Sequence, residues 1–290
     1  MIRTITIFLT ACLLFVKCTA PIEINTRDSE PVLVIYGCLT NENQNQNIRL
    51  SRSSPYFYNA ENEIVSNAKV SVSASNGREY TFEHKAKGYY FSQRRFAVVP
   101  GMTYRLSVEV DINKDGVVEL YEAETVTPPL VAFDSINITK MKIMGFLHYS
   151  LNIFMQEPFE TENYYLFKYV VNDSISNDLI SNFIIQDDLM INGEYIDGVS
   201  ITFFNSESDF RDPENTRDML RVTQGDRIRL QIMNIEKGYY YFIRDCTMEK
   251  YGENPFFGGP PSNIYTNLPK GAVGYFTSYC IHEKETFIPE

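Results

Sequence analysis

The stretch Thr103-Tyr104-Arg105-Leu106-Ser107-Val108-Glu109-Val110 alternates between polar and apolar side chains over its whole length. Successive side chains of a β-strand point to opposite faces of the sheet, so this period of two predicts a strand with one buried face. Residues 69–74 alternate in the same way, and residues 32–39 form a mostly apolar run. Turn signals such as Asn76-Gly77 separate these segments. We therefore predict an immunoglobulin-like antiparallel β-sandwich over residues 31–129.

The next part of the chain also favours strands. Thr127-Pro128-Pro129 interrupts the pattern, and proline cannot donate a hydrogen bond to a sheet, so we place a domain boundary there. Residues 130–290 are predicted to form a second β-rich domain. Its one helix is expected near residues 236–250, where apolar side chains recur at helical spacing. The expected strands of this domain are residues 133–139, 146–155, 164–171, 199–204, 226–235 and 272–280.

The composition excludes two classes of protein. With 26 basic and 37 acidic side chains among 290 residues, the formal charge is −11, and 44% of the residues are hydrophobic. A composition this polar argues against a multi-span membrane protein, and its negative charge opposes binding to a phosphate backbone. The small basic patch of Lys85, Lys87, Arg94 and Arg95 does not change this expectation, so we predict no nucleic-acid partner.

The N-terminus has the pattern of an export signal. Arg3 precedes an apolar run over residues 5–16, which is shorter than the roughly 20 residues of a membrane-spanning helix. Cys18 follows the run directly, as in a lipoprotein signal whose cysteine receives the acyl chains. Cys12 matches a lipobox better, but cleavage there would leave apolar residues at the mature start, which favours Cys18. We therefore predict a signal peptide at residues 1–17, lipidation at Cys18 with Cys12 as the alternative, and a tether over residues 18–30.

Three cysteines remain after the signal region. Cys38 lies in an apolar strand-like run and is predicted to belong to the core. Cys246 and Cys280 lie 34 residues apart, and export would place them in an oxidising compartment. A disulfide between them and two separate buried thiols are both consistent with the sequence, and neither is preferred.

One motif matches a calcium loop. Asp111, Asn113 and Asp115 stand at alternate positions before Gly116, and Glu122 occupies the twelfth position of an EF-hand pattern. Both flanks alternate as strands, which would carry Glu122 away from the other ligands. We therefore favour an Asp-Gly hairpin turn, with a three-ligand calcium site at Asp111, Asn113 and Asp115 as the alternative and no other cofactor.

The sequence carries no convergent catalytic set. It has no Gly-x-Ser-x-Gly, His-Glu-x-x-His or Cys-x-x-Cys motif, and its three histidines are scattered. Glu157, Glu160, Asp187 and Asp188 would suit a glycosidase pair, but acidic residues are common here and a solvated acidic face is the simpler interpretation. We therefore expect a non-enzymatic protein.

Aromatic side chains are the remaining candidates for binding. Tyr89-Tyr90, Tyr164-Tyr165 and Tyr239-Tyr240-Tyr241 would serve as stacking platforms for sugar rings if alternate members shared a face. Packing in a core or between strands is the competing interpretation, and the absence of tryptophan favours it.

Several segments in fixed order resemble a known family. After the signal cysteine come Leu33-Val34-Ile35-Tyr36-Gly37-Cys38-Leu39-Thr40, then Gly101-Met102-Thr103-Tyr104, and finally Gly271-Ala272-Val273-Gly274-Tyr275-Phe276. This order is similar to the domain of unknown function 4249 family of Bacteroidetes cell-envelope lipoproteins. The resemblance implies a β-rich envelope protein without assigned catalytic residues that accompanies TonB-dependent outer-membrane receptors.

Together these observations predict a lipid-anchored outer-membrane protein that acts as an interaction accessory, with the receptor as the partner that the resemblance implies. The alternative is a glycan- or peptide-binding module that feeds such a receptor. The positions after Cys18 lack an acidic cluster, which favours attachment facing the periplasm over the cell surface.

Overall fold

A computed structural model describes residues 32–53, 62–143, 145–159, 161–175, 179–206, 220–252 and 264–290. The signal region, the tether and both candidate lipidation cysteines lie outside the described residues. The strands are β1 (Leu33–Thr40), β2 (Asn47–Arg52), β3 (Lys69–Ala74), β4 (Glu79–Ala86), β5 (Tyr89–Ser92), β6 (Thr103–Val110), β7 (Glu119–Val126), β8 (Ser135–Ile143), β9 (Phe146–Gln156), β10 (Tyr164–Val171), β11 (Ser174–Ile175), β12 (Ile184–Asp187), β13 (Tyr195–Ser206), β14 (Arg221–Val222), β15 (Arg227–Asn234) and β16 (Ala272–Phe287). A 3₁₀ turn, η1 (Ile180–Asn182), and the helix α2 (Lys237–Gly252) complete the described elements.

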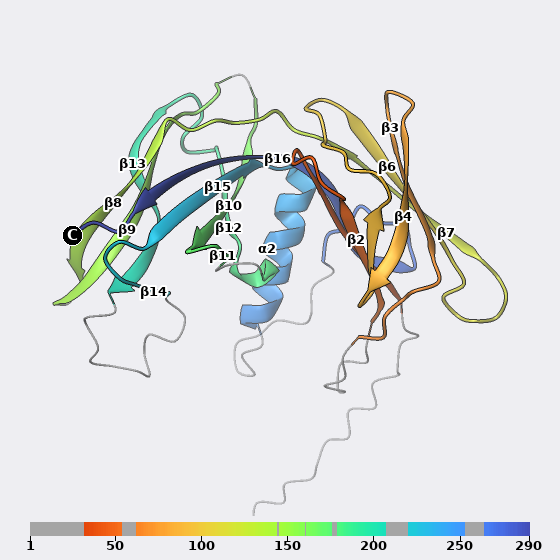
Figure 1. The fold of residues 1–290 in the computed structure, drawn as a ribbon. Helices are drawn as coiled ribbons and strands as arrows, with labels where there is room; N and C mark the ends of the chain where they lie inside the picture. Colours follow the sequence, from red (N-terminus) through yellow and green to blue (C-terminus); the bar gives the residue numbers. More distant parts are fainter. Residues whose placement is uncertain are drawn as a thin grey trace, which may run out of the picture. The chain divides into compact units, whose positions relative to one another are not determined.

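The predicted fold class, mainly β with one helix towards the C-terminus, is confirmed (Figure 1). In β6 every second side chain is buried, as the alternation predicts, and the strand pairs antiparallel with β3 and β7. The large sheet runs in the order β11-β10-β15-β16-β1-β2-β5-β4-β3-β6-β7, with β12 paired to β10. A smaller sheet has the order β14-β13-β9-β8.

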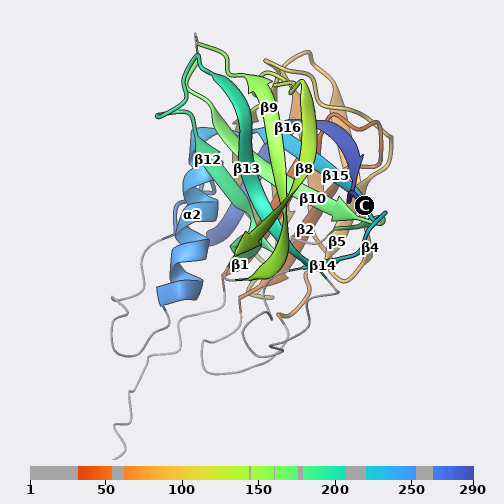
Figure 2. The same ribbon diagram turned by 90° about the vertical axis from the view of Figure 1, so that its left-hand side faces the viewer.

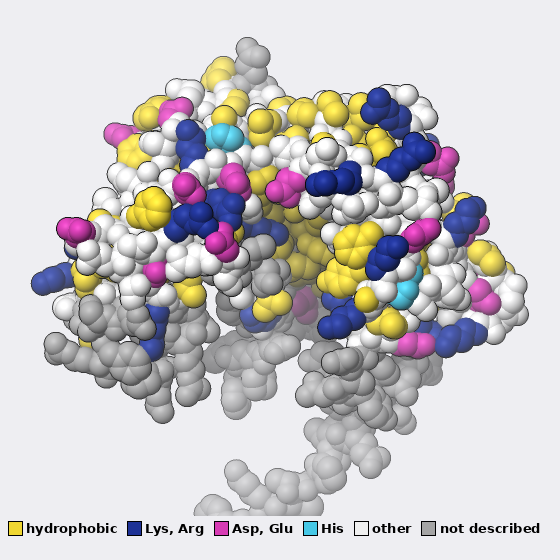
Figure 3. Space-filling model, viewed as in Figure 1, with side chains coloured by type: hydrophobic (Ala, Val, Ile, Leu, Met, Phe, Trp, Pro, Cys, Tyr) yellow, Lys and Arg dark blue, Asp and Glu magenta, His cyan; other side chains and the backbone are white. Residues whose placement is uncertain are grey.

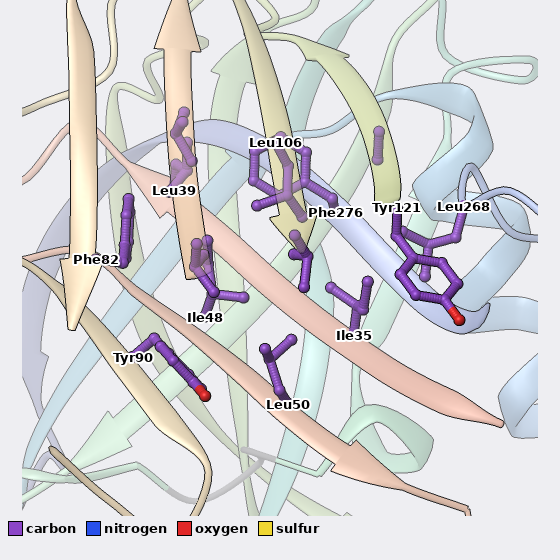
Figure 4. Packing of buried hydrophobic residues seen from close by; sticks show 14 of the residues in the cluster. Ile35, Leu39, Ile48, Leu50, Phe82, Tyr90, Leu106, Tyr121, Leu268 and Phe276 are labelled. Carbon is purple, nitrogen blue, oxygen red and sulfur yellow. The ribbon is translucent and has the colours of Figure 1, made fainter. Parts of the chain in front are cut away.

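The strands of the N-terminal half enclose one core. The sheet from β16 to β7 curls until β7 returns beside β16, where the Ser278 amide donates to Thr125 Oγ1 at 3.1 Å. Figure 4 shows Ile35, Ile48, Leu106 and Phe276 converging from different strands of this curled sheet. Burial of these apolar side chains is the main force that holds the half together.

The long strand β16 belongs to both halves of the chain. Its first part pairs in parallel with β1, from Leu33 opposite Ala272 to Thr40 opposite Tyr279. Its second part pairs antiparallel with β15, from Cys280 opposite Asn234 to Phe287 opposite Arg227. The predicted strand ends at residue 280, whereas β16 continues to Phe287. The added part carries charged residues that interrupt the apolar pattern, and one of them, Glu283, pairs with Arg229 at 3.4 Å.

The sharing of β16 changes the division predicted at residues 127–129. Leu268, Ala272, Phe276 and Cys280 lie in the N-terminal core, so the end of the chain completes the half that the beginning starts. The described residues from Val32 onward form one compact unit. The proline break at residues 127–129 gives no information about β16, which comes from the far end of the sequence and pairs with β1.

The C-terminal half has three layers (Figure 2). The smaller sheet packs on one face of β10 and β15 through residues such as Leu151, Phe204 and Leu230. Helix α2 covers the other face, where Tyr239 and Ile243 pack against Leu166. The predicted helix at residues 236–250 is thus confirmed within two residues at each end. No helix among the described residues is long and apolar enough to span a membrane.

Candidate ligand cleft

A cleft of about 460 Å³ opens where the first turns of α2 meet the start of β10 and the end of β12. Loops on either side, around residues 159–162 and 187–192, complete its wall. Figure 2 shows α2 beside β12 at this place. The cleft therefore lies where the helix layer meets the strand ends of the large sheet.

The structure brings two of the three aromatic segments together here. The ring centroids of Tyr164 and Tyr240 are 5.0 Å apart, those of Tyr164 and Tyr241 are 6.4 Å apart, and Tyr240 and Tyr241 meet edge to face at 5.8 Å. Tyr239 instead lies in the core beneath the helix, and Tyr165 points to the opposite face of β10. The segment Tyr89-Tyr90 is on β5, and Tyr90 fills the N-terminal core. Segment spacing alone did not show which tyrosines would meet.

Two cations cover the tyrosine faces. Lys237 Nζ lies 5.6 Å from the Tyr164 ring centroid, and the Arg244 guanidinium lies 4.5 Å from the Tyr241 centroid. Lys237 Nζ also donates to Glu162 Oε1 at 2.8 Å, and the Tyr164 hydroxyl donates to the same carboxylate. Burial and this carboxylate raise the pKa of Tyr164 to about 12, while Lys237 and Tyr164 together lower the pKa of Glu162. The cleft thus carries both signs of charge around an aromatic centre.

Two carboxylates beside the cleft are buried, so the expected solvated acidic face is wrong for them. Glu157 is 1% exposed and Asp188 is 4% exposed. Glu157 accepts hydrogen bonds from Asn163 Nδ2 and the Tyr165 hydroxyl, both at 2.9 Å, and from the Gly193 amide at 2.6 Å. Asp188 accepts from the Asn163 amide at 2.7 Å. These hydrogen bonds compensate for the burial of the two carboxylates. They also join the loops that frame the cleft, so the two acids hold these loops in place.

Of the other two acids considered for a glycosidase pair, only Asp187 lies among the described residues. Asp187 is half-buried at the end of β12, where its Oδ2 accepts from the Tyr240 hydroxyl at 3.4 Å. Glu160 lies outside the described residues. The three described acids, Glu157, Asp187 and Asp188, therefore do not form one solvated face.

Phe159 and Leu189 line the cleft, and Met190 follows Leu189 in the same loop; we call these three exposed apolar residues the rim. Their exposed fractions, 76%, 81% and 84%, are the highest among the large apolar side chains of the described ranges. Gly193 has a φ of +76°, and a Cβ there would lie 2.5 Å from Phe159 Cδ2, so only glycine lets Phe159 pack so closely. The sequence offered one unused signal for this rim, an apolar pair directly after Asp187-Asp188.

The calcium motif forms a hairpin loop. Asp111 Oδ1 and Oδ2 accept from the amides of Asp115 and Gly116 at 3.2 and 2.9 Å, and Asn113 Nδ2 donates to Glu119 Oε1 at 3.3 Å. Glu122 pairs with Ser107 inside the β6–β7 ladder, away from the loop, so the EF-hand geometry is not formed. The favoured hairpin between the two flanking strands is confirmed, but its connection spans residues 111–118 and is longer than a two-residue Asp-Gly turn. No group of three acidic, histidine or cysteine side chains suited to a metal occurs in the part of the chain that the structure describes.

Cys246 and Cys280, for which the sequence is consistent with either a disulfide or two thiols, are free thiols in the structure. Cys280 is buried in the N-terminal core, whereas Cys246 packs in the cluster beneath α2. Burial and the nearby Asp245 raise the pKa of the Cys246 thiol to about 11, which leaves little reactive thiolate. Cys38 is half-buried, with its Sγ 3.6 Å from the Tyr239 hydroxyl.

A second depression, of about 380 Å³, lies over β10, β15 and β16. Its charges neutralise one another: Arg229 pairs with Asp173 at 3.5 Å and with Glu283 at 3.4 Å. Figure 3 shows basic and acidic side chains interspersed on this face of the molecule. The aromatic cleft, with its exposed apolar rim, is therefore the better candidate for a binding site.

Comparison with known proteins gives a family and weak similarities to solved structures, two of which are described here. No curated protein matches the chain. A segment of two fibronectin type III domains from chicken tenascin is 11% identical, with a TM-score of 0.20, over 70% of this chain and 90% of that one. The FN1–FN3 domains of chicken CNTN1 are 12% identical, with a TM-score of 0.25, over 88% of this chain and 65% of that one. Neither similarity is close enough to bear on function. A family model matches residues 19–285, nearly the whole chain after Cys18, and the chain belongs to that family, the domain of unknown function DUF4249.

Proposed function

We propose that this protein is a non-enzymatic outer-membrane lipoprotein, lipidated at Cys18, that acts as an interaction accessory to an envelope receptor. The export signal in the sequence supports the location, and the resemblance to Bacteroidetes lipoproteins points to a TonB-dependent receptor as the partner. Attachment facing the periplasm and attachment at the cell surface are both compatible with this role.

The observation that carries the proposal is the apolar rim. Phe159, Leu189 and Met190 project from loops that Glu157 and Asp188 hold from within. Exposed apolar side chains on a braced framework are typical of a protein-binding site, since their burial in a complex gains free energy and requires little ordering of the loops. Methionine also adapts its shape to a partner surface.

The cleft next to the rim suits a peptide segment better than a sugar ring. A pyranose stacks on a free aromatic face, but Lys237 and Arg244 lie over the rings of Tyr164 and Tyr241. A peptide in an extended conformation would match this site if it carried an apolar side chain for the rim and an acidic side chain for the exposed cations Lys237 and Arg244.

The contacts of the buried acids support a non-enzymatic role. Glu157 accepts three hydrogen bonds from the chain itself, and Asp188 accepts one from the Asn163 amide. Carboxylates engaged in this way act as braces for backbone rather than as groups presented to a substrate.

The interaction is tested by site-specific photo-crosslinking in living cells. A photoreactive residue at position 190 should give one discrete adduct with an integral outer-membrane receptor. The same residue at Val99, which is 49% exposed in the other half, serves as the control and should give none. Equal labelling at both positions, or no adduct at position 190, would contradict the proposal. With the photoreactive residue kept at position 190, Leu189→Asp should also abolish the adduct.

The anchor is tested separately by incorporation of labelled palmitate. We expect incorporation in the wild-type chain and in Cys12→Ser, and its loss in Cys18→Ser. Retained label in Cys18→Ser would move the anchor to Cys12, and no label in the wild-type chain would end the lipoprotein proposal.

A second candidate function is a glycan- or peptide-binding module that passes its ligand to the receptor, and the tyrosine-lined cleft favours it. Thermal unfolding with panels of oligosaccharides and short acidic peptides separates the candidates. Saturable stabilisation that Arg244→Gln and Tyr241→Ala remove would assign the cleft to a small ligand. Stabilisation by sugars alone would overturn the preference for peptides.

A further inference from the structure

The loop between β6 and β7 lies at the end of the molecule where β1 begins. Leu33, the first residue of β1, pairs with Arg52, and the Arg52 amide donates to the Glu63 carbonyl at 2.8 Å. The Glu63 carboxylate then joins Arg52 Nη1 at 3.2 Å to Lys114 Nζ at 3.0 Å. Since Lys114 belongs to the loop of residues 111–118, this chain of contacts fixes the loop beside the start of β1.

This loop presents apolar side chains to solvent. Val117 and Val118 are 60% and 62% exposed, and Leu120 at the start of β7 is 56% exposed. The acidic residues of the loop are bound to its own backbone: Asp111 accepts from two amides, and Asp115 Oδ1 accepts from the Val117 amide at 2.8 Å. Figure 1 shows the loop projecting beyond β7. The acids thus shape a tip at which Val117, Val118 and Leu120 are exposed.

The rim and cleft belong to the opposite end of the strands. Thr40, the last residue of β1, pairs with Tyr279, and the following Cys280 pairs with Asn234. Asn234 in turn pairs with Tyr165 at the start of β10, next to the cleft. The register therefore separates the tip at the Leu33 end of β1 from the rim near its Thr40 end.

We infer that the tip, defined as Val117, Val118 and Leu120, rests on the lipid surface to which the protein is anchored. This inference rests on the proposed lipidation at Cys18. Leu33 follows Cys18 by fifteen positions, so the anchor lies at most about 50 Å from the start of β1, and the anchored segment enters the fold at this end. Valine and leucine side chains partition into the interface between headgroups and acyl chains. The contact places the rim on the side of the molecule that is farther from the bilayer surface.

The chain contains no tryptophan, so a single introduced one reports its own surroundings. We compare Val118→Trp with Leu189→Trp in the full-length lipidated protein, bound to vesicles of phosphatidylcholine and phosphatidylethanolamine that carry brominated acyl chains. Emission from Val118→Trp should be quenched about two-fold or more, because an interfacial side chain lies within reach of the bromines. Emission from Leu189→Trp should be unaffected. A third variant, Val99→Trp, controls for a general effect of exposed tryptophan.

Flotation of the same vesicles distinguishes failure of the anchor from failure of the tip. If the protein floats but Val118→Trp is not quenched, the tip contact is overturned while the anchor stands. Equal quenching of Val118→Trp and Leu189→Trp would also overturn it, since the molecule would then have no preferred orientation. If the protein does not float, the lipid anchor fails and the inference fails with it. A blue shift of Val118→Trp that depends on protein concentration, without quenching, would assign the tip to a second copy of the chain instead.

Discussion

The N-terminal and C-terminal halves are both built from strands, but they bury those strands differently. In the N-terminal half, β6 buries one face and leaves the other half-exposed or exposed, so a single core suffices. In the C-terminal half, β10 lies between the smaller sheet and α2, and both of its faces are largely buried. Helix α2 forms the third layer of this half. The aromatic cleft opens beside the first turns of α2, where this layer ends. This comparison shows that the candidate binding site arises from the way the layers pack and not from any one sequence motif.

The strand shared by the halves gives the largest expected effect. Phe276 is fully buried in the N-terminal core, so Phe276→Ala should lower the free energy of unfolding by about 3–5 kcal/mol. Because β16 also pairs with β15, urea unfolding followed by near-ultraviolet circular dichroism should show both halves lost in one transition. Phe287→Ala on the same strand, where Phe287 is 56% exposed, should have an effect of about 1 kcal/mol or less. Two separate transitions would show that the halves are independent.

The parallel pairing between β1 and β16 depends on a glycine. Gly274 has a φ of +108°, and a Cβ there would lie 2.0 Å from the Ile35 carbonyl oxygen. We expect Gly274→Ala to lower the free energy of unfolding by about 3 kcal/mol, because strain and a backbone clash act together. Gly77→Ala is the control, since Gly77 also has a positive φ but has no atom within 4 Å of the new methyl group. Its loss should be about 1 kcal/mol, from strain alone. If the two variants lose equal free energy of unfolding, β16 can shift away from the new methyl group at little cost in stability.

The brace behind the cleft should have an intermediate effect. In Glu157→Gln one carboxylate oxygen becomes an amide group, so a donor faces the hydroxyl or amide groups that now donate to Glu157. The free energy of unfolding should fall by about 1–3 kcal/mol, and proteolysis of the loop at residues 188–193 should become faster. Glu194→Gln, an exposed change on the same loop, should leave both measurements near wild-type values. Unchanged proteolysis in Glu157→Gln would mean that the rim is not held from within.

The smallest effect concerns the junction between the halves and depends on pH. Burial raises the pKa of Glu236, although Thr125 Oγ1 and the Val126 amide donate to it at 2.7 and 2.8 Å. At pH values between the ordinary pKa of Glu236, near 4.5, and its raised pKa in the folded protein, the folded chain holds more protons than the unfolded chain. The contribution of Glu236 to stability is therefore complete below 4.5 and falls as the pH rises through this window.

Glu236→Gln removes this titration. The difference in free energy of unfolding, variant minus wild type, should therefore increase as the pH rises through the same window. Urea titrations of both proteins at a series of pH values provide the measurement. A difference that stays constant with pH would contradict the assignment.

Parts of the binding region were predictable from the sequence, and the reasons differ between residues. Tyr164, Tyr240 and Tyr241 stood out as aromatic segments, but their meeting depends on how α2 lies across β10. Glu157 and Asp188 were recognisable as acids, yet their burial depends on Asn163 and Gly193, which the sequence pattern did not connect with them. Lys237 and Arg244 gave no signal at all, since a cation on an exposed helical face is ordinary.

The sequence by itself determined the class of the fold, the helix near the C-terminus and the pairing of local strands such as β6 with β7, because alternation and turn residues act between neighbours in the chain. Tertiary structure alone decided that β16 closes the N-terminal core beside β1 and that the helix layer ends at a cleft. It also decided that the apolar tip and the apolar rim stand at opposite ends of the strands. These features depend on contacts between segments far apart in sequence, and such contacts leave no periodic trace in the segments that make them.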